Sequence, residues 1–600
     1  MNKPNTRIRT DVRNIAIVAH VDHGKTTLVD RLLQFTGTIA AGGERVMDSN
    51  DLERERGITI LAKQTGIEYG NHFINIVDTP GHSDFGGEVE RTLQMVEGFL
   101  LLVDAAEGVL PGTRFVLQKA LALNLKPIVL INKVDRPDAD ISRTENMIHD
   151  LFLDLATNSD QLGFTTLYGS SRLGFVTTDP SVKTGTVQPL LDAIIKDIPA
   201  PVEQADGLQL LTTNLDYSNY LGQIAIGRVF SGTIKVGQPV ACCRDNSICK
   251  PQKITKLYKF RGLERVEVTE ASFGDIVAVA GFDEPVVIGM TLCDIGNPLP
   301  HAYVSVDEPT LSMYFCVNNS PFAGREGNLL TSRQIRDRLY KELKLNVALR
   351  VEDTDSADMF KVSGRGQLHL GILIENMRRE GFELQVSAPE VIYKEIDGKK
   401  CEPIEHLVVD VQSEHQGVVM ELLGKKKAEL THMTAYDNGR VRMEFLVPSR
   451  GLIGFRSQFL TDTRGSGIAT FSFHGYFPYK GDIVVRTKGA LVSMENGSAT
   501  GYALNMLQER GTLFIVPGDK IYEGLIVGEH SRETDLDINP CKPKKLSNMR
   551  TTGTDEAVNI EPPRIMSLEI CMEWIRPDEL IEITPESIRL RKKILRAALR

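Results

Sequence analysis

A glycine-lysine-threonine triplet is the first group of residues with the spacing for chemistry. It ends the run AHVDHGKT at residues 19–26, which follows an apolar segment and precedes an amphipathic one. In such a loop, backbone N–H groups at a helix start cradle a β-phosphate, the lysine neutralises β- and γ-oxygens, and the threonine hydroxyl ligates Mg²⁺. Lys25 and Thr26 are the candidates, although Ala19 stands where the pattern usually has its first glycine. A chance triplet at a helix start is the competing interpretation.

A second tetrapeptide, DTPG at residues 78–81, follows the predicted strand Phe73–Val77. A carboxylate at this position can hold Mg²⁺ through water, while the backbone of the glycine meets a γ-phosphate. Asp78 and Gly81 are therefore candidate ligands of a metal–nucleotide complex.

A third tetrapeptide, NKVD at residues 132–135, follows a predicted strand that ends at Ile131. Guanine carries an N1–H and an exocyclic amine, and one carboxylate, here that of Asp135, can accept from both. Adenine lacks these donors and would leave the buried carboxylate unpaired, which is a large penalty. Three such segments in this order, each after a strand, predict that the chain binds GTP with Mg²⁺.

The elements around these segments indicate an α/β domain. Apolar strands alternate with helical patterns, which is typical of a parallel sheet covered on both faces. The predicted elements are strands Asn14–Ala19, Phe73–Val77, Phe99–Val103 and Pro127–Ile131 and helix Lys25–Phe35.

The sequence pattern changes twice in the rest of the chain. Short β-branched runs between Leu208 and Leu299 predict an antiparallel barrel. A strand–helix–strand–strand–helix–strand pattern then appears twice, which predicts two ferredoxin-like α+β units. The expected elements are 310–317, 332–345, 349–362, 367–380 and 382–386 in the first copy, and 405–411, 416–430, 433–447, 454–463 and 468–473 in the second.

Length and composition agree with several soluble domains. At roughly 150 residues per domain, 600 residues suggest about four domains. Hydrophobic residues make up 42% and charged residues 25%, which excludes disordered, collagen-like and coiled-coil chains. The 8 cysteines include no CxxC pair, the start of the chain is polar, and no apolar run approaches the ~18 residues of a membrane span. We therefore expect a cytoplasmic protein that does not contact membranes.

The segment RGITI at residues 56–60, with the DHGKT loop and the run DTPGH, resembles the translational GTPases. The resemblance implies that Thr59 senses the γ-phosphate and Mg²⁺, that His82 orients the attacking water as the catalytic residue, and that Val21 and Ile58 form a hydrophobic gate beside it. It also implies that Ser170 and Ser171 contact the guanine. The family usually has Ser-Ala-Leu at this place, whereas this chain has Ser-Ser-Arg at residues 170–172. The implied GTP-binding residues are Asp22, His23, Gly24, Lys25, Thr26, Thr27, Thr59, Asp78, Gly81, Asn132, Lys133, Asp135, Ser170 and Ser171, and the metal ligands are Thr26, Thr59 and Asp78.

Within that group the domain order resembles elongation factor G and LepA, but only residues 389–400 separate the two ferredoxin-like units, so the arm that drives translocation has no counterpart. Several stretches resemble the BipA (TypA) family, at residues 363–370, 375–382, 448–456, 544–550 and 553–557. The expected domains are a P-loop GTPase domain at 1–201, a β-barrel at 202–302, ferredoxin-like domains at 303–393 and 394–480, and a family-specific C-terminal domain at 481–600.

The BipA resemblance also implies partners. We expect a monomer that binds both ribosomal subunits at the elongation-factor site, contacts rRNA and A-site tRNA, and hydrolyses GTP when stimulated by the ribosome. A role in large-subunit assembly and in translation under stress or cold is implied as well. Two alternatives stay open. One is an RNA-binding factor that acts only on immature subunits and uses GTP hydrolysis as a timer. The other is a GTPase coupled to an unrelated enzyme, which the barrel fits but the paired ferredoxin-like units do not.

Two basic runs bear on RNA binding. Residues 542–550 carry four basic side chains and no acid, and 589–600 carry six and none. A run of charge is usually solvated, and we prefer that interpretation for the second run. The first run lies among glycines and threonines, so we predict an RNA-binding loop with contacts from Lys542, Lys544, Lys545 and Arg550, since an acidic protein must concentrate its phosphate contacts.

Overall fold

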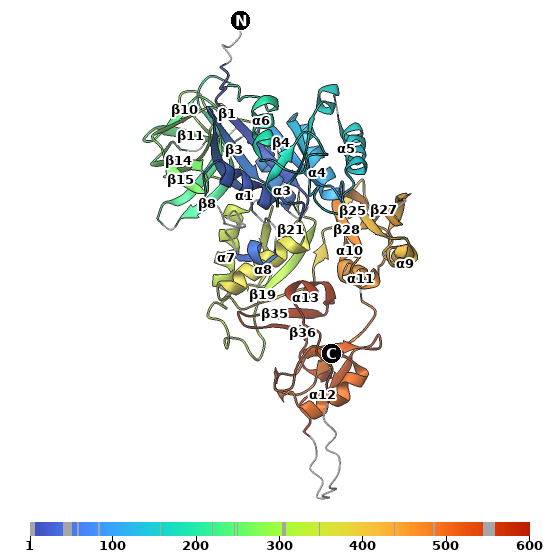
Figure 1. Cartoon of the computed structure of the whole chain (residues 1–600). Coiled ribbons are helices and arrows are strands. Elements are labelled where there is room, and N and C mark those ends of the chain that lie inside the picture. Colours follow the sequence, from blue (N-terminus) through green and yellow to red (C-terminus); the bar gives the residue numbers. More distant parts are fainter. Residues whose placement is uncertain are drawn as a thin grey trace, which may run out of the picture. The chain divides into compact units, whose positions relative to one another are not determined.

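The computed structural model describes residues 7–39, 51–56, 59, 61–81, 85–156, 158–203, 205–218, 220–244, 247–248, 250–302, 308–346, 348–436, 439–483, 486–543 and 559–600. The chain divides into two compact units, Met1–Asp307 with Thr470–Ser472 and Glu308–Ala469 with Phe473–Arg600. Its labelled elements are drawn in Figure 1. In the described part of the chain, no helix combines the length and the apolar character needed to cross a membrane.

The first unit begins with a seven-stranded sheet in the order β2-β3-β1-β4-β5-β6-β7. β1, β3, β4, β5 and β6 run parallel to one another, whereas β2 and β7 are antiparallel edge strands. The parallel strands end at one edge of the sheet, where the predicted nucleotide motifs follow them. The strands are β1 (Val12–Ala19), β2 (Lys63–Tyr69), β3 (His72–Asp78), β4 (Gly98–Asp104), β5 (Lys126–Asn132), β6 (Thr165–Ser170) and β7 (Phe175–Thr177).

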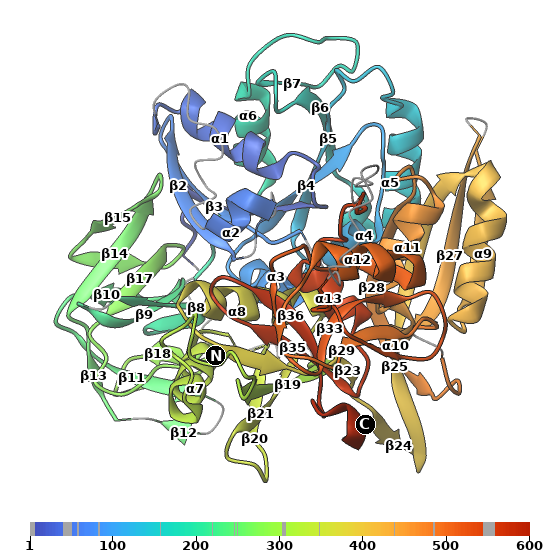
Figure 2. The same ribbon diagram turned by 90° about the horizontal axis from the view of Figure 1, so that it is seen from below.

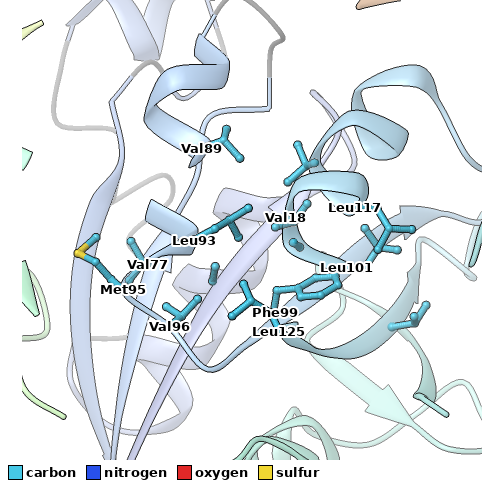
Figure 3. Packing of buried hydrophobic residues seen from close by; sticks show 14 of the residues in the cluster. Val18, Val77, Val89, Leu93, Met95, Val96, Phe99, Leu101, Leu117 and Leu125 are labelled. Carbon is cyan, nitrogen blue, oxygen red and sulfur yellow. The ribbon is translucent and has the colours of Figure 1, made fainter. Parts of the chain in front are cut away.

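Helices cover both faces of this sheet, which explains why its strands are apolar throughout. Ile15 and Ile17 of β1 pack with Leu28 on the face of α1 and α6, while Val18 and Leu101 pack on the face of α3, α4 and α5. Figure 3 shows Val89 and Leu93 of α3 and Leu117 of α4 in the second core. The helices are α1 (Lys25–Phe35), α3 (Gly86–Leu93), α4 (Pro111–Ala122), α5 (Ile141–Leu155) and α6 (Gln188–Asp197), and a short α2 (Asp51–Arg56) precedes β2.

An antiparallel β domain completes the first unit, as the short β-branched runs predicted. Its main sheet has the order β12-β11-β18-β8-β9-β17-β14-β15, and β10 pairs with β16. The buried guanidinium of Arg228 in this domain pairs with Glu97 beside β4. These strands are β8 (Gln209–Ser218), β9 (Gly222–Ser231), β10 (Thr233–Lys235), β11 (Pro239–Arg244), β12 (Ser247–Ile248), β14 (Lys256–Arg261), β15 (Glu264–Glu267), β16 (Glu270–Ser272), β17 (Ile276–Ala280) and β18 (Thr291–Cys293).

The turn between β14 and β15 lies against the edge strand β2, as Figure 2 shows. Gly262 donates its N–H to the Gly66 carbonyl at 2.7 Å, and its own carbonyl accepts from the Thr65 hydroxyl at 2.5 Å. A Cβ on Gly66 would lie 2.3 Å from the Phe260 carbonyl oxygen, so a side chain there would force the two domains apart.

The second unit contains both ferredoxin-like patterns apart from Thr470–Ser472. The first copy comprises β19 (Leu311–Val317), α7 (Ser332–Leu345), β20 (Arg350–Asp353), β21 (Met359–Gly364), α8 (Gln367–Arg379) and β22 (Leu384–Val386). The second comprises β25 (Lys399–Gln412), α9 (Gln416–Lys425), β26 (Glu429–Ala435), β27 (Arg440–Pro448), α11 (Phe455–Asp462) and β28 (Ile468–Pro478). The helix expected over 416–430 is shorter than predicted, because Lys427 adopts a left-handed φ of 60° and a strand begins at Glu429.

The C-terminal segment joins the sheet of the first ferredoxin-like copy. β35 pairs antiparallel with β22, so that Leu384 lies opposite Ile583 in an 11-stranded sheet. Residues 490–592 contribute β29 (Ala490–Ser493), α12 (Gly501–Leu507), β31 (Gly511–Leu513), β33 (Leu525–His530), β34 (Leu536–Ile538), α13 (Leu568–Trp574), β35 (Glu579–Ile583) and β36 (Ile588–Lys592).

Only the end of the second basic run is exposed as we predicted, at Lys593, Arg596 and Arg600, because its first part belongs to β36. Arg591 and Lys592 are buried at the end of β36. The Lys592 ammonium lies 2.5 Å from Asp535, 2.7 Å from Asp578 and 2.8 Å from Glu579. These three carboxylates offset the cost of burying the cation, and the sequence does not place them near it.

Candidate nucleotide-binding site

The predicted phosphate loop connects β1 to α1. Gly24 adopts a left-handed conformation (φ 96°) at the N-terminus of α1. A Cβ there would lie 2.5 Å from Nδ2 of Asn132, so both the backbone angle and the available space favour glycine. Because Gly24 has no side chain to cap the helix, the N-terminal backbone N–H groups of α1 favour an anionic ligand.

Lys25 and Asp78 form a buried ion pair beside this loop. Lys25 Nζ lies 3.1 Å from Asp78 Oδ1, and the two side chains are 7% and 1% exposed. Apart from this contact, the described residues give the Asp78 carboxylate no hydrogen-bond donor. Burial raises the pKa of Asp78, and the nearby ammonium groups of Lys25 and Lys63 oppose that rise.

These residues fit a divalent cation bound with phosphate. The desolvated carboxylate of Asp78, at the end of β3, contacts Lys25 at the start of α1. Thr26 is the next residue of α1, and carboxylate and hydroxyl oxygens both suit Mg²⁺. Thr59 is buried as well, with 6% of its surface exposed.

Asn132 joins the phosphate loop to the loop that follows β6. Its Nδ2 donates to the His23 carbonyl at 2.7 Å. Its Oδ1 accepts from the Ser171 N–H at 2.9 Å and from the Ser171 hydroxyl at 3.0 Å. One buried amide therefore holds the predicted phosphate-binding and base-binding segments together.

Lys133 is held by an ion pair that sequence reasoning missed. It has a left-handed φ of 59°, and its Nζ lies 2.8 Å from Oδ2 of the fully buried Asp104. Burial would raise the pKa of Asp104, but hydrogen bonds from Lys133 and the Ala106 N–H lower it overall, so the carboxylate stays charged. Asp135 follows two residues later and is partly exposed. A signal for Asp104 was present, because it ends a buried strand as Asp78 does.

Arg31 of α1 supports the base-side loop through its backbone. Its guanidinium donates to the carbonyls of Ser171 at 3.3 Å and Arg172 at 2.8 Å. Because these contacts do not involve the side chains of the loop, the departure from Ser-Ala-Leu does not remove them.

The remaining predicted residues divide into described and undescribed positions. Val21 is partly buried, and a Cβ on Gly81 would lie 3.1 Å from the Val21 nitrogen, so these two loops are close. Asp22 and Thr27 are exposed, while His23 and Ser170 are buried. Lys542 is exposed, and its carbonyl accepts from the Thr500 hydroxyl at 2.7 Å. Ile58, His82, Lys544, Lys545 and Arg550 lie outside the described residues.

Comparison with known families assigns most of the chain. Residues 10–200 match the elongation factor Tu GTP binding domain, and 222–293 match elongation factor Tu domain 2. Residues 399–487 match the elongation factor G C-terminus, and 488–597 match the TypA/BipA C-terminal domain. Together with the geometry of the loops, these matches define a translational GTPase, a hydrolase of GTP.

Curated relatives resolve the family. The chain is 53% identical over 597 residues to the large ribosomal subunit assembly factor BipA of Bacillus subtilis (strain 168), covering 98% of this chain and 97% of the relative. Proteins of the same name from Synechocystis sp. (strain PCC 6803) and Salmonella typhimurium (strain LT2) are each 52% identical, with coverage of 97% and 98% of this chain and 98% and 97% of the relative, respectively. The chain belongs to the BipA (TypA) family.

A solved structure shows the same fold at low identity. A crystal structure of a protein from Thermus thermophilus aligns with a TM-score of 0.54 and 16% identity, covering 79% of this chain and 98% of that one.

Proposed function

We propose that this protein is a ribosome-associated GTPase that binds Mg²⁺–GTP at the described site, hydrolyses it when stimulated by the ribosome, and takes part in assembly of the large ribosomal subunit. The observation that carries the nucleotide assignment is the buried Lys25–Asp78 pair at the start of α1, whose carboxylate lacks further donors among the described residues. The relatives named above, which match over nearly the whole chain, support the ribosomal role.

Each residue on the phosphate side of the site has its own role. The N–H groups from Asp22 to Thr27 bind the β-phosphate, and Lys25 neutralises β- and γ-oxygens. Thr26, Thr59 and Asp78 would hold Mg²⁺, which when bound neutralises charge on the β- and γ-oxygens. The Gly81 backbone meets the γ-phosphate.

The base side selects guanine. Asp135 accepts from the guanine N1–H and exocyclic amine, and Asn132 and Lys133 shape the pocket around the base. The loop at Ser170 and Ser171, held by Asn132, closes this side. Rejection of ATP follows from the donors that adenine lacks.

Hydrolysis requires a water molecule in line with the γ-phosphate. His82 orients this water as the catalytic residue, and Val21 and Ile58 form the hydrophobic gate beside it. We propose that the ribosome completes this arrangement, so that turnover by the free protein is slow.

The two ends of the chain have different roles in the proposed complex with the ribosome. In the five-domain division proposed from the sequence, residues 1–201 bind GTP and 481–600 contact RNA. Lys542, Lys544, Lys545 and Arg550 contact rRNA or the acceptor end of A-site tRNA. The protein acts as a cytoplasmic monomer on both subunits, and supports translation under stress or cold.

A second candidate is favoured by the name of the relatives, large ribosomal subunit assembly factor. On that hypothesis the protein binds only immature subunits, and hydrolysis is a timer. Co-sedimentation with mature ribosomes and with large-subunit precursors, in GTP, GDP and a non-hydrolysable GTP analogue, separates the two. Analogue-dependent binding to mature ribosomes supports the first candidate, binding only to precursors supports the second, and binding to neither refutes both.

A further inference from the structure

A buried ion pair links two described residues on either side of Thr59. Glu53 on α2 precedes Thr59, and Lys63, the first residue of β2, follows it. Lys63 Nζ lies 2.5 Å from Glu53 Oε2, and the Glu53 side chain is only 1% exposed. The other oxygen of the same carboxylate accepts from the Leu61 N–H at 3.3 Å. The Glu53 carboxylate, before Thr59, therefore contacts both Leu61 and Lys63, after it.

The same ion pair is connected to the predicted metal site. Lys63 lies directly opposite Asp78 in the antiparallel pairing of β2 with β3, so their side chains share one face of the sheet. The register of the two strands thus places the Lys63 end of the ion pair beside Asp78.

We propose that Glu53 and Lys63 are positioning residues for GTP hydrolysis, which hold Thr59 against the γ-phosphate and Mg²⁺ side of the site and join that segment to Asp78. This inference rests on the proposed role of Thr59 in the GTP-bound state. GDP binding does not need Thr59, because GDP lacks the γ-phosphate that this residue senses. Loss of the pair should therefore affect hydrolysis much more than GDP affinity.

The pair is expected to affect hydrolysis because Thr59 must be placed accurately. Without the pair, one carboxylate no longer holds Leu61 and Lys63 together, so keeping Thr59 in place costs more conformational entropy. A displacement of about 1 Å in a positioning group can reduce turnover about 100-fold.

The test compares Glu53→Gln, Lys63→Met and Lys63→Arg with the unaltered full-length protein. We expect Glu53→Gln and Lys63→Met to lower ribosome-stimulated kcat by about 10- to 100-fold while GDP affinity changes less than about threefold. Lys63→Arg retains the charge and should keep most of the activity. Glu97→Gln is the matched control, because Glu97 pairs with the buried Arg228 outside the nucleotide site. It should reduce thermal stability but not kcat.

A second readout does not depend on turnover. Arg54 is exposed on α2, so trypsin cleavage after this residue reports the order of the segment. In the unaltered protein, a non-hydrolysable GTP analogue should slow this cleavage relative to GDP. Glu53→Gln and Lys63→Met should abolish the difference, whereas Glu97→Gln and Lys63→Arg should preserve it.

The outcomes separate this inference from the proposed function. If the unaltered protein shows stimulated hydrolysis and analogue-dependent protection, and Glu53→Gln and Lys63→Met show both equally, the pair does not position Thr59. If the two variants lose GDP affinity and stability in the same proportion as kcat, the pair is merely structural and the inference is also wrong. If the unaltered protein itself lacks both properties, the proposed function fails and the inference falls with it.

Discussion

Replacing Asn132 by alanine removes the amide that joins the phosphate loop to the base-side loop. Three hydrogen bonds disappear, to the His23 carbonyl, the Ser171 N–H and the Ser171 hydroxyl. Because these groups are buried, each unpaired group costs about 1–3 kcal/mol. The free protein can relax to avoid that cost, and GDP binding must then restore the original arrangement.

The expected loss of affinity follows from this cost. If about 2–4 kcal/mol is transferred to the binding step, Kd for GDP rises about 30- to 1,000-fold. The amide joins protein to protein, so inosine diphosphate should lose affinity by the same factor. Fluorescence titration or calorimetry measures both constants.

Asn75→Ala is the control for this prediction. Asn75 is also a buried asparagine in a strand of the same sheet, and it donates to Asn14 at 2.7 Å, away from the nucleotide loops. The control should lower the melting temperature with little change in Kd. A rise of less than about threefold in Kd for Asn132→Ala would show that Asn132 does not organise the site. A loss specific to GDP would show that Asn132 acts through the exocyclic amine of guanine, which inosine lacks, and not through the loops.

Four further predictions concern other parts of the chain. Asp135→Asn should shift preference from guanine to xanthine nucleotides, because the amide then matches N1–H and the 2-oxo group; equal binding of ATP and GTP by the unaltered protein would contradict the assignment. His82→Ala should keep nucleotide affinity and lose ribosome-stimulated hydrolysis, and stimulated turnover within a factor of about two would show that another group orients the water. Replacing the four basic residues of 542–550 by Gln should weaken ribosome binding and make the slope of log affinity against log salt shallower by about one unit per lost phosphate contact; weaker binding with an unchanged slope would indicate a structural loop. Lys592→Met should lower the free energy of unfolding by about 1–3 kcal/mol at neutral pH, measured by chemical denaturation, since Glu579 keeps its pair with Arg486 but all three carboxylates lose the Lys592 ammonium. In the unaltered protein, burial raises the pKa of Asp535 but Lys592 lowers it overall, so this contribution is present above about pH 4 and declines as pH falls further, and a flat profile would contradict it.

Local pattern was sufficient for most elements and for the motifs. The helix over Ser332–Leu345 agrees with its prediction to the residue, because its amphipathic spacing is bounded by a Thr331 capping box. The strands before Asp78 and Asn132 were equally clear, since buried parallel strands are apolar throughout. Residues at the ends of parallel strands share one edge of the sheet, so the nucleotide motifs could be grouped without a structure.

The tertiary structure alone decided which distant residues meet. Nothing in the sequence near Leu384 identifies Ile583 as its cross-strand partner, because strand pairing depends on the whole chain path. Lys592 was misjudged for the same reason, as a run of charge is normally solvated unless carboxylates from other strands surround it. The Glu53–Lys63 pair is nearer in sequence, yet only the antiparallel pairing of β2 with β3 brings it beside Asp78. Local periodicity determines secondary structure, whereas burial of a charge requires partners that only the folded chain brings within reach.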